Sequence, residues 1–152
     1  MSYEVEQAFY DLLCGDAALV ALISTRIYPQ VAPQNVPDDE MPSHVVYQVV
    51  SSIPERHLKG PGAPTVTRMQ VDCYARVYSD AKAIARAIRE CADGYRGTIT
   101  SPLGDGTLEL RSVKLEDARD GYEYTTPESG WHRVSLDYMV WHPSTVPLHV
   151  GS

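Results

Sequence analysis

The sequence has 152 residues, of which 43% are hydrophobic and 22% are charged, ordinary proportions for one globular domain. A chain of about 150 residues can bury roughly 68–70% of its unfolded surface, which argues against disordered, collagen-like and disulfide-stapled proteins. Thirteen basic and twenty acidic residues give a net charge of −7, which argues against a protein that grips nucleic-acid phosphates.

The N-terminal region predicts two helices. Apolar residues recur at helical spacing over residues 5–13, and Gly15 follows as a stop signal. Asp16, a typical N-cap residue, precedes a short apolar stretch over residues 17–23. That stretch is the longest apolar run and is far shorter than the roughly 18 residues of a membrane span. The opening residues also lack the basic and apolar regions of a secretory signal peptide.

A strand between two long loops is predicted next. Residues 26–29 are typical of an extended segment, and residues 29–42, with four prolines and an acidic run, of a loop. Residues 44–50 are almost all β-formers, which predicts a strand covered on both faces. Residues 51–64 predict a second long loop, and loops of this length in a compact domain are usually functional or disordered.

The clearest strand in the sequence is Thr65–Val77. Hydrophobic and polar residues alternate along it, which places the first set on the core and the second on the opposite face. A helix is then predicted over residues 79–92, with Ser79 as its N-cap and Gly94 as its left-handed stop.

The C-terminal half predicts further strands. Residues 98–115 indicate a hairpin around an Asp-Gly turn, with a bulge where the apolar residues change parity. Residues 116–130 are typical of an acidic loop, and residues 131–142 of the last strand. We therefore expect one α+β domain over residues 1–142, with a mostly antiparallel sheet, two helices packed on one face and long loops. A flexible tail is expected over residues 143–152.

Motifs that carry chemistry are scarce in this sequence. The five histidines lack the spacing of metal-binding motifs, and neither a phosphate-binding glycine loop nor a serine-hydrolase elbow is present. Cys14, Cys73 and Cys91 are widely spaced and odd in number, which predicts reduced, buried thiols in a cytosolic protein. We expect no catalytic residue, no cofactor and no metal.

The polar face of Thr65–Val77 is compatible with a solvated surface or with a contact between subunits. It carries tyrosine and arginine, which are enriched at protein interfaces. The candidate residues are Arg68, Gln70, Asp72, Tyr74 and Arg76.

The acidic segment over residues 116–130 is compatible with a solvated loop, with ion pairs between subunits, or with a divalent-cation site. Its carboxylates lack the spacing of a calcium-binding loop, so the solvated loop is preferred. Asp117, Arg119 and Asp120 are the candidates for subunit contacts.

The centre of the loop over residues 51–64 is mixed in charge and framed by glycine and proline. It is compatible with a flexible surface loop or with one that contacts a partner or lines a pore. Its candidate residues are Glu55, Arg56, His57, Leu58 and Lys59.

Several short segments follow one another in order from about residue 3 to residue 142. They are Leu12-Leu13, Asp16–Leu19, Arg26–Pro29, Pro42–Gln48, Glu55-Arg56, Val71–Ala75, the helix over residues 79–92, Glu116–Glu123 and Arg133–Tyr138. Taken together in this order and spacing, they resemble the tail-completion, or tail terminator, proteins of long-tailed phages and gene-transfer particles.

The resemblance implies a structural virion protein without enzymatic activity. Such proteins form a ring, expected to be hexameric, that caps the tail tube, ends its growth and offers the head-tail joining surface. The implied partners are further copies of this chain, a tail-tube protein and a head–tail connector or adaptor protein, with DNA passing through the lumen without specific binding and no membrane involved. The implied location is the virion tail or neck, after assembly in the host cytoplasm. We expect the loop over residues 51–64 to lie on the tube-facing rim or in the lumen.

Two other interpretations stay open. One is a head–tail connector or neck adaptor of the same particle, a class of protein that also forms rings. The other is a small cytosolic enzyme whose site is assembled from separated residues, such as His57 together with the acidic segment.

Overall fold

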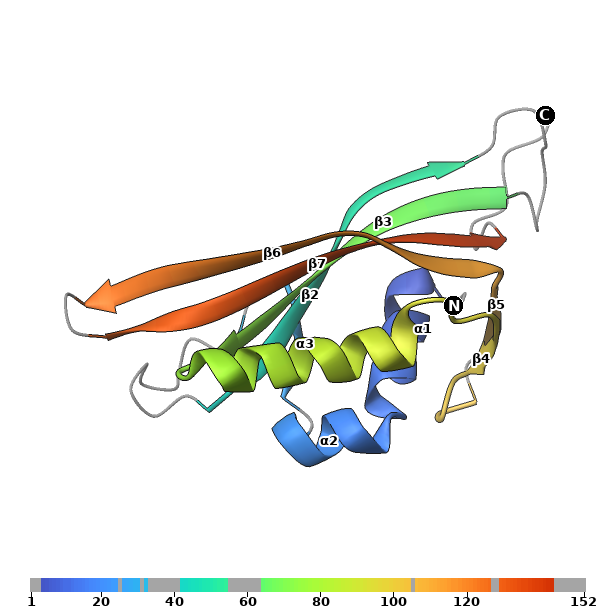
Figure 1. Ribbon diagram of the computed structural model, residues 1–152. Helices are drawn as coiled ribbons and strands as arrows, with labels where there is room; N and C mark the ends of the chain where they lie inside the picture. The colour runs from blue at the N-terminus through green and yellow to red at the C-terminus, as the bar shows by residue number, and fades with distance from the viewer. Residues whose placement is uncertain are drawn as a thin grey trace.

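The computed structural model describes residues 4–24, 26–30, 32, 42–54, 64–104, 106–126 and 129–143. Within these ranges, three helices lie on one side of a five-stranded sheet, and a two-stranded sheet lies near one end (Figure 1). The helices are α1 (Val5–Cys14), α2 (Ala17–Ile23) and α3 (Tyr78–Ala92). The strands are β1 (Ile27–Pro29), β2 (His44–Pro54), β3 (Pro64–Ala75), β4 (Gly97–Thr100), β5 (Thr107–Leu110), β6 (Ser112–Thr126) and β7 (Ser129–Pro143). The expected α+β class is confirmed, and the short α2 brings the described helices to three.

The large sheet has the strand order β1-β2-β3-β7-β6. The short β1 pairs in parallel with the start of β2, and all other neighbours in the sheet are antiparallel. The extended segment expected at residues 26–29 is thus an edge strand. β6 forms the opposite edge, and its hairpin with β7 projects past the N-terminal end of α3 (Figure 1).

The core lies between the helices and the inner face of the sheet. The predicted alternation along β3 is confirmed, because Met69, Val71 and Cys73 are fully buried. From the helical layer, Phe9 packs on Tyr138 with ring centroids 5.8 Å apart. Burial of each such side chain contributes about 1.5–3 kcal/mol to folding, so this layer fixes the sheet on which the candidate site lies.

The helix ends agree with the sequence at two points and differ at one. The backbone N–H of Leu19 donates to Asp16 Oδ2 at 3.0 Å, which confirms the predicted N-cap of α2. Gly94 has the expected left-handed conformation, with φ of 79°. The predicted N-cap at Ser79 is wrong, because Val77 holds that position without a side-chain cap bond.

The acidic loop predicted at residues 116–130 is wrong. Most of this segment is the second half of β6, which pairs with β7 as far as Thr126 and Ser129. The residue pattern indicated a loop because β6 is an edge strand that is exposed on both faces over residues 116–120. Hydrophobic and polar residues therefore do not alternate there.

Three strand boundaries also differ from expectation, the first being the end of β3 at Ala75 in place of Val77, which is 54% exposed. β2 runs on to Pro54 and β3 begins at Pro64, so both ends of the predicted loop over residues 51–64 are strand. Coverage of β2 on both faces holds only at its start, since Val49 and Val50 are exposed. The parity change predicted in residues 98–115 is confirmed as a break at Arg111, whose N–H donates to the Trp141 carbonyl at 2.7 Å.

Several predictions fall outside the described residues. They are the interface loop over residues 55–59, the greater part of the loop over residues 29–42, and the tail from residue 144 onward. Within the described ranges, no helix is long and apolar enough to cross a membrane. The three cysteines are free, as predicted, and Cys73 is fully buried while Cys14 and Cys91 are partly exposed.

Candidate assembly interface

The sheet face opposite the helices, called the open face here, is the candidate interface. Register places side chains from four strands on it, because alternate residues of β2, β3, β7 and β6 point away from the core. Its central residues are His44, Val46 and Gln48 of β2, Arg68, Gln70, Asp72 and Tyr74 of β3, Trp131, Arg133, Ser135 and Asp137 of β7, and Asp117 and Arg119 of β6. No described helix covers this face (Figure 1).

An aromatic cluster closes one end of the open face. His44 stacks on Tyr74 with centroids 5.0 Å apart, and the Trp131 ring stands edge-on to both. The Arg76 guanidinium carbon lies 3.7 Å from the Trp131 ring centroid, a cation–π contact, and Arg76 also donates to the Gly130 carbonyl at 3.1 Å. Burial, together with the nearby Asp72, raises the pKa of Tyr74 to about 12. The Tyr74 hydroxyl therefore stays neutral at physiological pH.

Ion pairs join β6 to β7 across the middle of the open face. Arg119 binds Asp117 and Asp137, with its Nη1 2.6 Å from Asp137 Oδ2, and Arg133 binds Glu123. Hydrogen bonds to Asp137 and Asp117 raise the pKa of the Arg119 guanidinium, so its charge is permanent. The same face thus holds fixed positive and negative groups that a partner can match.

The predicted contact residues of β3 lie together on this face. Asp72 is buried and accepts hydrogen bonds from Gln70 Nε2 at 3.1 and 3.2 Å. Arg68 is half-buried, and no ion pair is recorded for it in the described part of the chain. Arg68, Gln70 and Tyr74 are half-buried in the single chain.

Asp120, predicted with Asp117 and Arg119, lies on the other side of the sheet. It accepts hydrogen bonds from the Tyr78 hydroxyl and the Lys82 ammonium, each at 2.8 Å. These bonds lower the pKa of Asp120. Because Asp117 and Asp120 point to opposite faces of β6, they cannot ligate one cation, and no metal-binding group occurs among the described residues.

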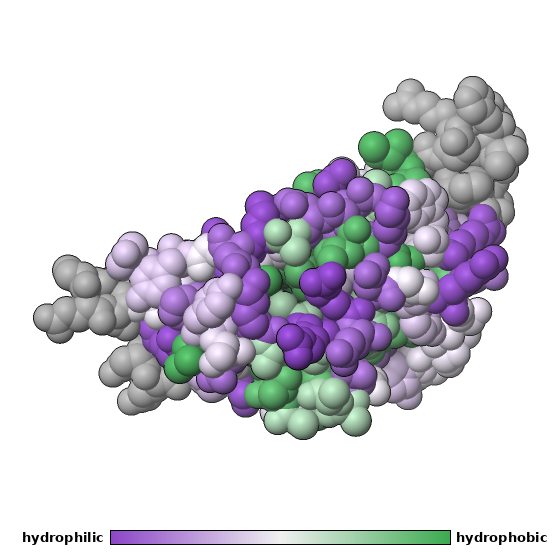
Figure 2. All heavy atoms as spheres, in the orientation of Figure 1, coloured by the Kyte–Doolittle hydropathy of each residue, from purple (hydrophilic) through white to green (hydrophobic). Residues whose placement is uncertain are grey.

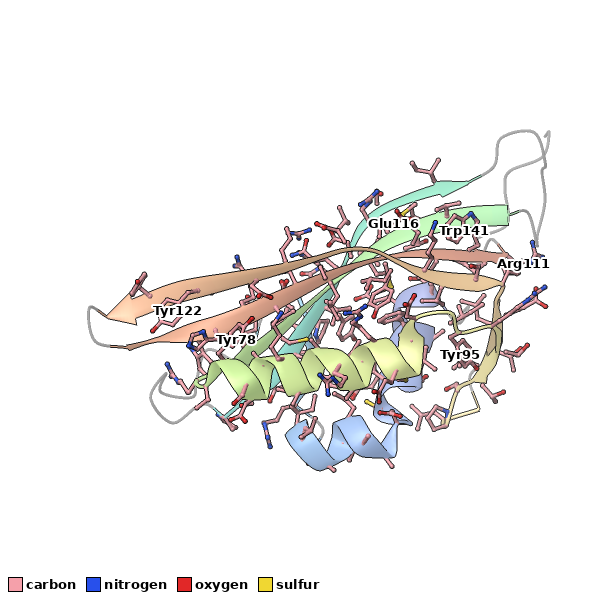
Figure 3. All side chains as sticks on the ribbon, in the orientation of Figure 1. Tyr78, Tyr95, Arg111, Glu116, Tyr122 and Trp141 are labelled. Carbon is pink, nitrogen blue, oxygen red and sulfur yellow. The ribbon has the colours of Figure 1, made fainter. Side chains whose placement is uncertain are left out.

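A second surface, at the far end of the β6–β7 hairpin, was missed by the sequence interpretation. Tyr122 contacts Tyr124 and His132 with centroids 4.7 and 4.8 Å apart, and His132 also contacts Tyr78 (Figure 3). Tyr124 is 77% exposed. The signal was present, because Tyr122, Tyr124 and Thr126 are β-formers at alternating positions.

A solved structure shares this fold. A chain of the virion of a native gene transfer agent (GTA) particle superposes with a TM-score of 0.64, covering 92% of this chain and 95% of that chain, at 19% sequence identity. No curated protein matches the sequence.

The sequence model of the family described as tail completion protein gp17 matches residues 7–143. A protein that completes a phage tail is a structural part of the virion, so the expectation of a virion component rather than an enzyme is confirmed. Because the match spans nearly the whole chain, the protein belongs to the tail completion protein gp17 family.

Proposed function

We propose that this protein forms a closed hexameric ring that caps the tail tube, ends its growth and presents the surface to which the head's connector binds. The observation that carries the proposal is the open face, on which charged and aromatic side chains from four strands lie together, several of them buried or half-buried. Its tyrosine, tryptophan and arginine side chains are of the types enriched at protein interfaces.

A closed ring needs two different surfaces on each copy, because each subunit contacts one neighbour with one patch and the next neighbour with another. The open face and the exposed tyrosines of the hairpin end are two such unlike surfaces. On this basis Arg68, Gln70, Asp72, Tyr74, Arg76, Asp117 and Arg119 belong to a subunit contact on the open face, and Asp120 to the opposite side.

The two rims of the ring have different partners in this proposal. One rim contacts the tail-tube protein, with Glu55, Arg56, His57, Leu58 and Lys59 on that rim or in the lumen, and the other contacts the connector or adaptor protein. DNA passes through without being held, because a net charge of −7 on every copy disfavours contacts with phosphates.

Particles assembled without this protein test the proposal. We expect tails of irregular, extended length that are not joined to heads, and restoration of both properties by the wild-type chain. Tails of normal length attached to filled heads would contradict it. Tails of normal length that stay unattached would instead indicate the neck adaptor.

A loop exchange adds a matched test. Replacement of residues 55–59 by a glycine–serine linker should leave ring formation intact and block tail capping. Capping at the wild-type level would remove these residues from the tube contact.

A further inference from the structure

A groove runs between α3 and β6 on the helical side of the sheet, with a volume of about 740 Å³. It exists because α3 lies over β3 and β7, which leaves the inner face of β6 largely uncovered (Figure 1). Ala118, Val134 and Leu136 lie at its base; Ala118 is exposed, whereas Val134 and Leu136 are buried. Figure 2 shows small hydrophobic areas among mostly hydrophilic side chains on this side of the molecule. The walls carry Lys82, Arg86, Arg89, Glu90 and Asp93.

Only one of the positive side chains that line the groove forms an ion pair within the described part of the chain. Lys82 pairs with Asp120. Arg86 and Arg89, three residues apart on the exposed side of α3, have no ion pair or hydrogen bond recorded in the described ranges. Guanidinium groups bind carboxylates and stack on aromatic rings. The groove is therefore suited to a segment that presents exposed aromatic rings to these guanidinium groups.

The hairpin end, defined as residues 120–132, has this composition. It carries neither lysine nor arginine, and its carboxylates Asp120 and Glu123 bind Lys82 and Arg133 of the same chain. Tyr122 and Tyr124 are 42% and 77% exposed. The segment cannot fill the groove of its own chain, because Tyr124 lies six residues beyond Ala118 on the same strand, a distance of about 20 Å. The hairpin also projects beyond the helical layer, which leaves it free to reach a neighbour (Figure 1).

We propose that the hairpin end of one copy docks in the α3–β6 groove of the next copy. Tyr122 and Tyr124 of the incoming hairpin enter the groove, where Arg86 and Arg89 meet their ring faces. The two surfaces differ, so each copy inserts its hairpin into one neighbour and receives the hairpin of the other neighbour in its groove. The contact therefore repeats head to tail around a ring. The inference rests on the ring of the proposed function and names the contact that closes it.

Site-specific photo-crosslinking tests the contact directly. The full-length protein carries p-benzoylphenylalanine in place of Tyr124 and is mixed with isotope-labelled wild-type protein before irradiation. We expect peptides that join position 124 of one isotope form to residues 82–93 or 118 of the other. The matched control places the same probe at Leu103, which is 83% exposed in the β4–β5 connection, and should give no crosslinks to the groove.

The outcomes separate this contact from the ring itself. Oligomers that form without crosslinks from position 124 to the groove would overturn the docking proposal and leave the ring intact. A protein that stays monomeric, in solution and on tail tubes, would overturn both.

A charge reversal provides an independent readout. Arg86→Glu should weaken self-association at least tenfold and leave the melting temperature of the single chain unchanged. Arg96→Glu makes the same charge change at an exposed position outside the groove and should have little effect. Equal weakening by both variants would indicate a general charge effect and contradict the groove as the docking site.

Discussion

Arg119 neutralises a repulsion that is built into the open face. Asp117 of β6 and Asp137 of β7 stand directly opposite each other in the strand register, and Arg119 binds both. The side chain of Asp137 is only 13% exposed, so water screens this pair incompletely. Replacement by alanine, Arg119→Ala, leaves two carboxylates facing each other across the strands.

The expected cost follows from two contributions. Loss of exposed ion pairs removes about 0–1 kcal/mol, and like charges directly opposite in a sheet cost about a further 0.2–1 kcal/mol. We therefore expect Arg119→Ala to lower the free energy of unfolding by about 0.2–2 kcal/mol at low ionic strength. Adding Asp137→Asn removes the repulsion and should recover roughly half of the loss.

Urea unfolding of the wild type, Arg119→Ala and the double variant, at low salt and in about 1 M salt, measures these energies. At that salt concentration the Debye length falls to about 3 Å, so the cost should shrink. A loss that is equal at both salt concentrations and unaffected by Asp137→Asn would refute the electrostatic reasoning. It would indicate that the arginine stem contributes packing instead.

Three further predictions concern the fold that carries the interface. Burial lowers the pKa of His142 below 6.5, so near that pH the unfolded chain takes up a proton that the folded chain does not. The free energy of unfolding should therefore be highest above about pH 7.5 and fall as the pH drops through 6.5. Urea unfolding across this range should show this pH dependence in the wild type and not in His142→Gln. A Cβ on Gly130 would clash with the Glu123 carbonyl oxygen, so Gly130→Ala should cost about 1–3 kcal/mol and increase hydrogen exchange at the hairpin end, whereas wild-type exchange rates there would contradict the close approach. The Tyr138 hydroxyl is buried with no hydrogen-bond partner in the described part of the chain, so Tyr138→Phe should leave the melting temperature unchanged or raise it by the equivalent of up to about 1 kcal/mol, and a clear decrease would indicate a partner for that hydroxyl.

The parts of the fold that face the core were predictable from residue patterns. The alternation around Val71 and the helical stripe around Leu13 each bury one side of an element, so their periods survive in the sequence. The N-cap role of Asp16 was equally predictable from the sequence, because an N-cap is a local interaction.

The candidate interface was harder to predict because its parts are distant in the sequence or exposed on both sides. β6 carries no hydrophobic period over residues 116–120, since neither face there packs on the core, and its acidic side chains resembled those of a loop. The pairing of Asp117 with Asp137, and the meeting of His44, Tyr74 and Trp131, depend on strand order and register. Those features are set by long-range packing and leave no local signal.

Electron cryo-microscopy of tails purified from assembling particles tests the central claim most directly. The account predicts one closed ring of this protein, six copies by our proposal, seated on the last tube ring at the end that joins the head. Copies distributed along the tube, or an isolated subunit in place of a ring, would contradict it.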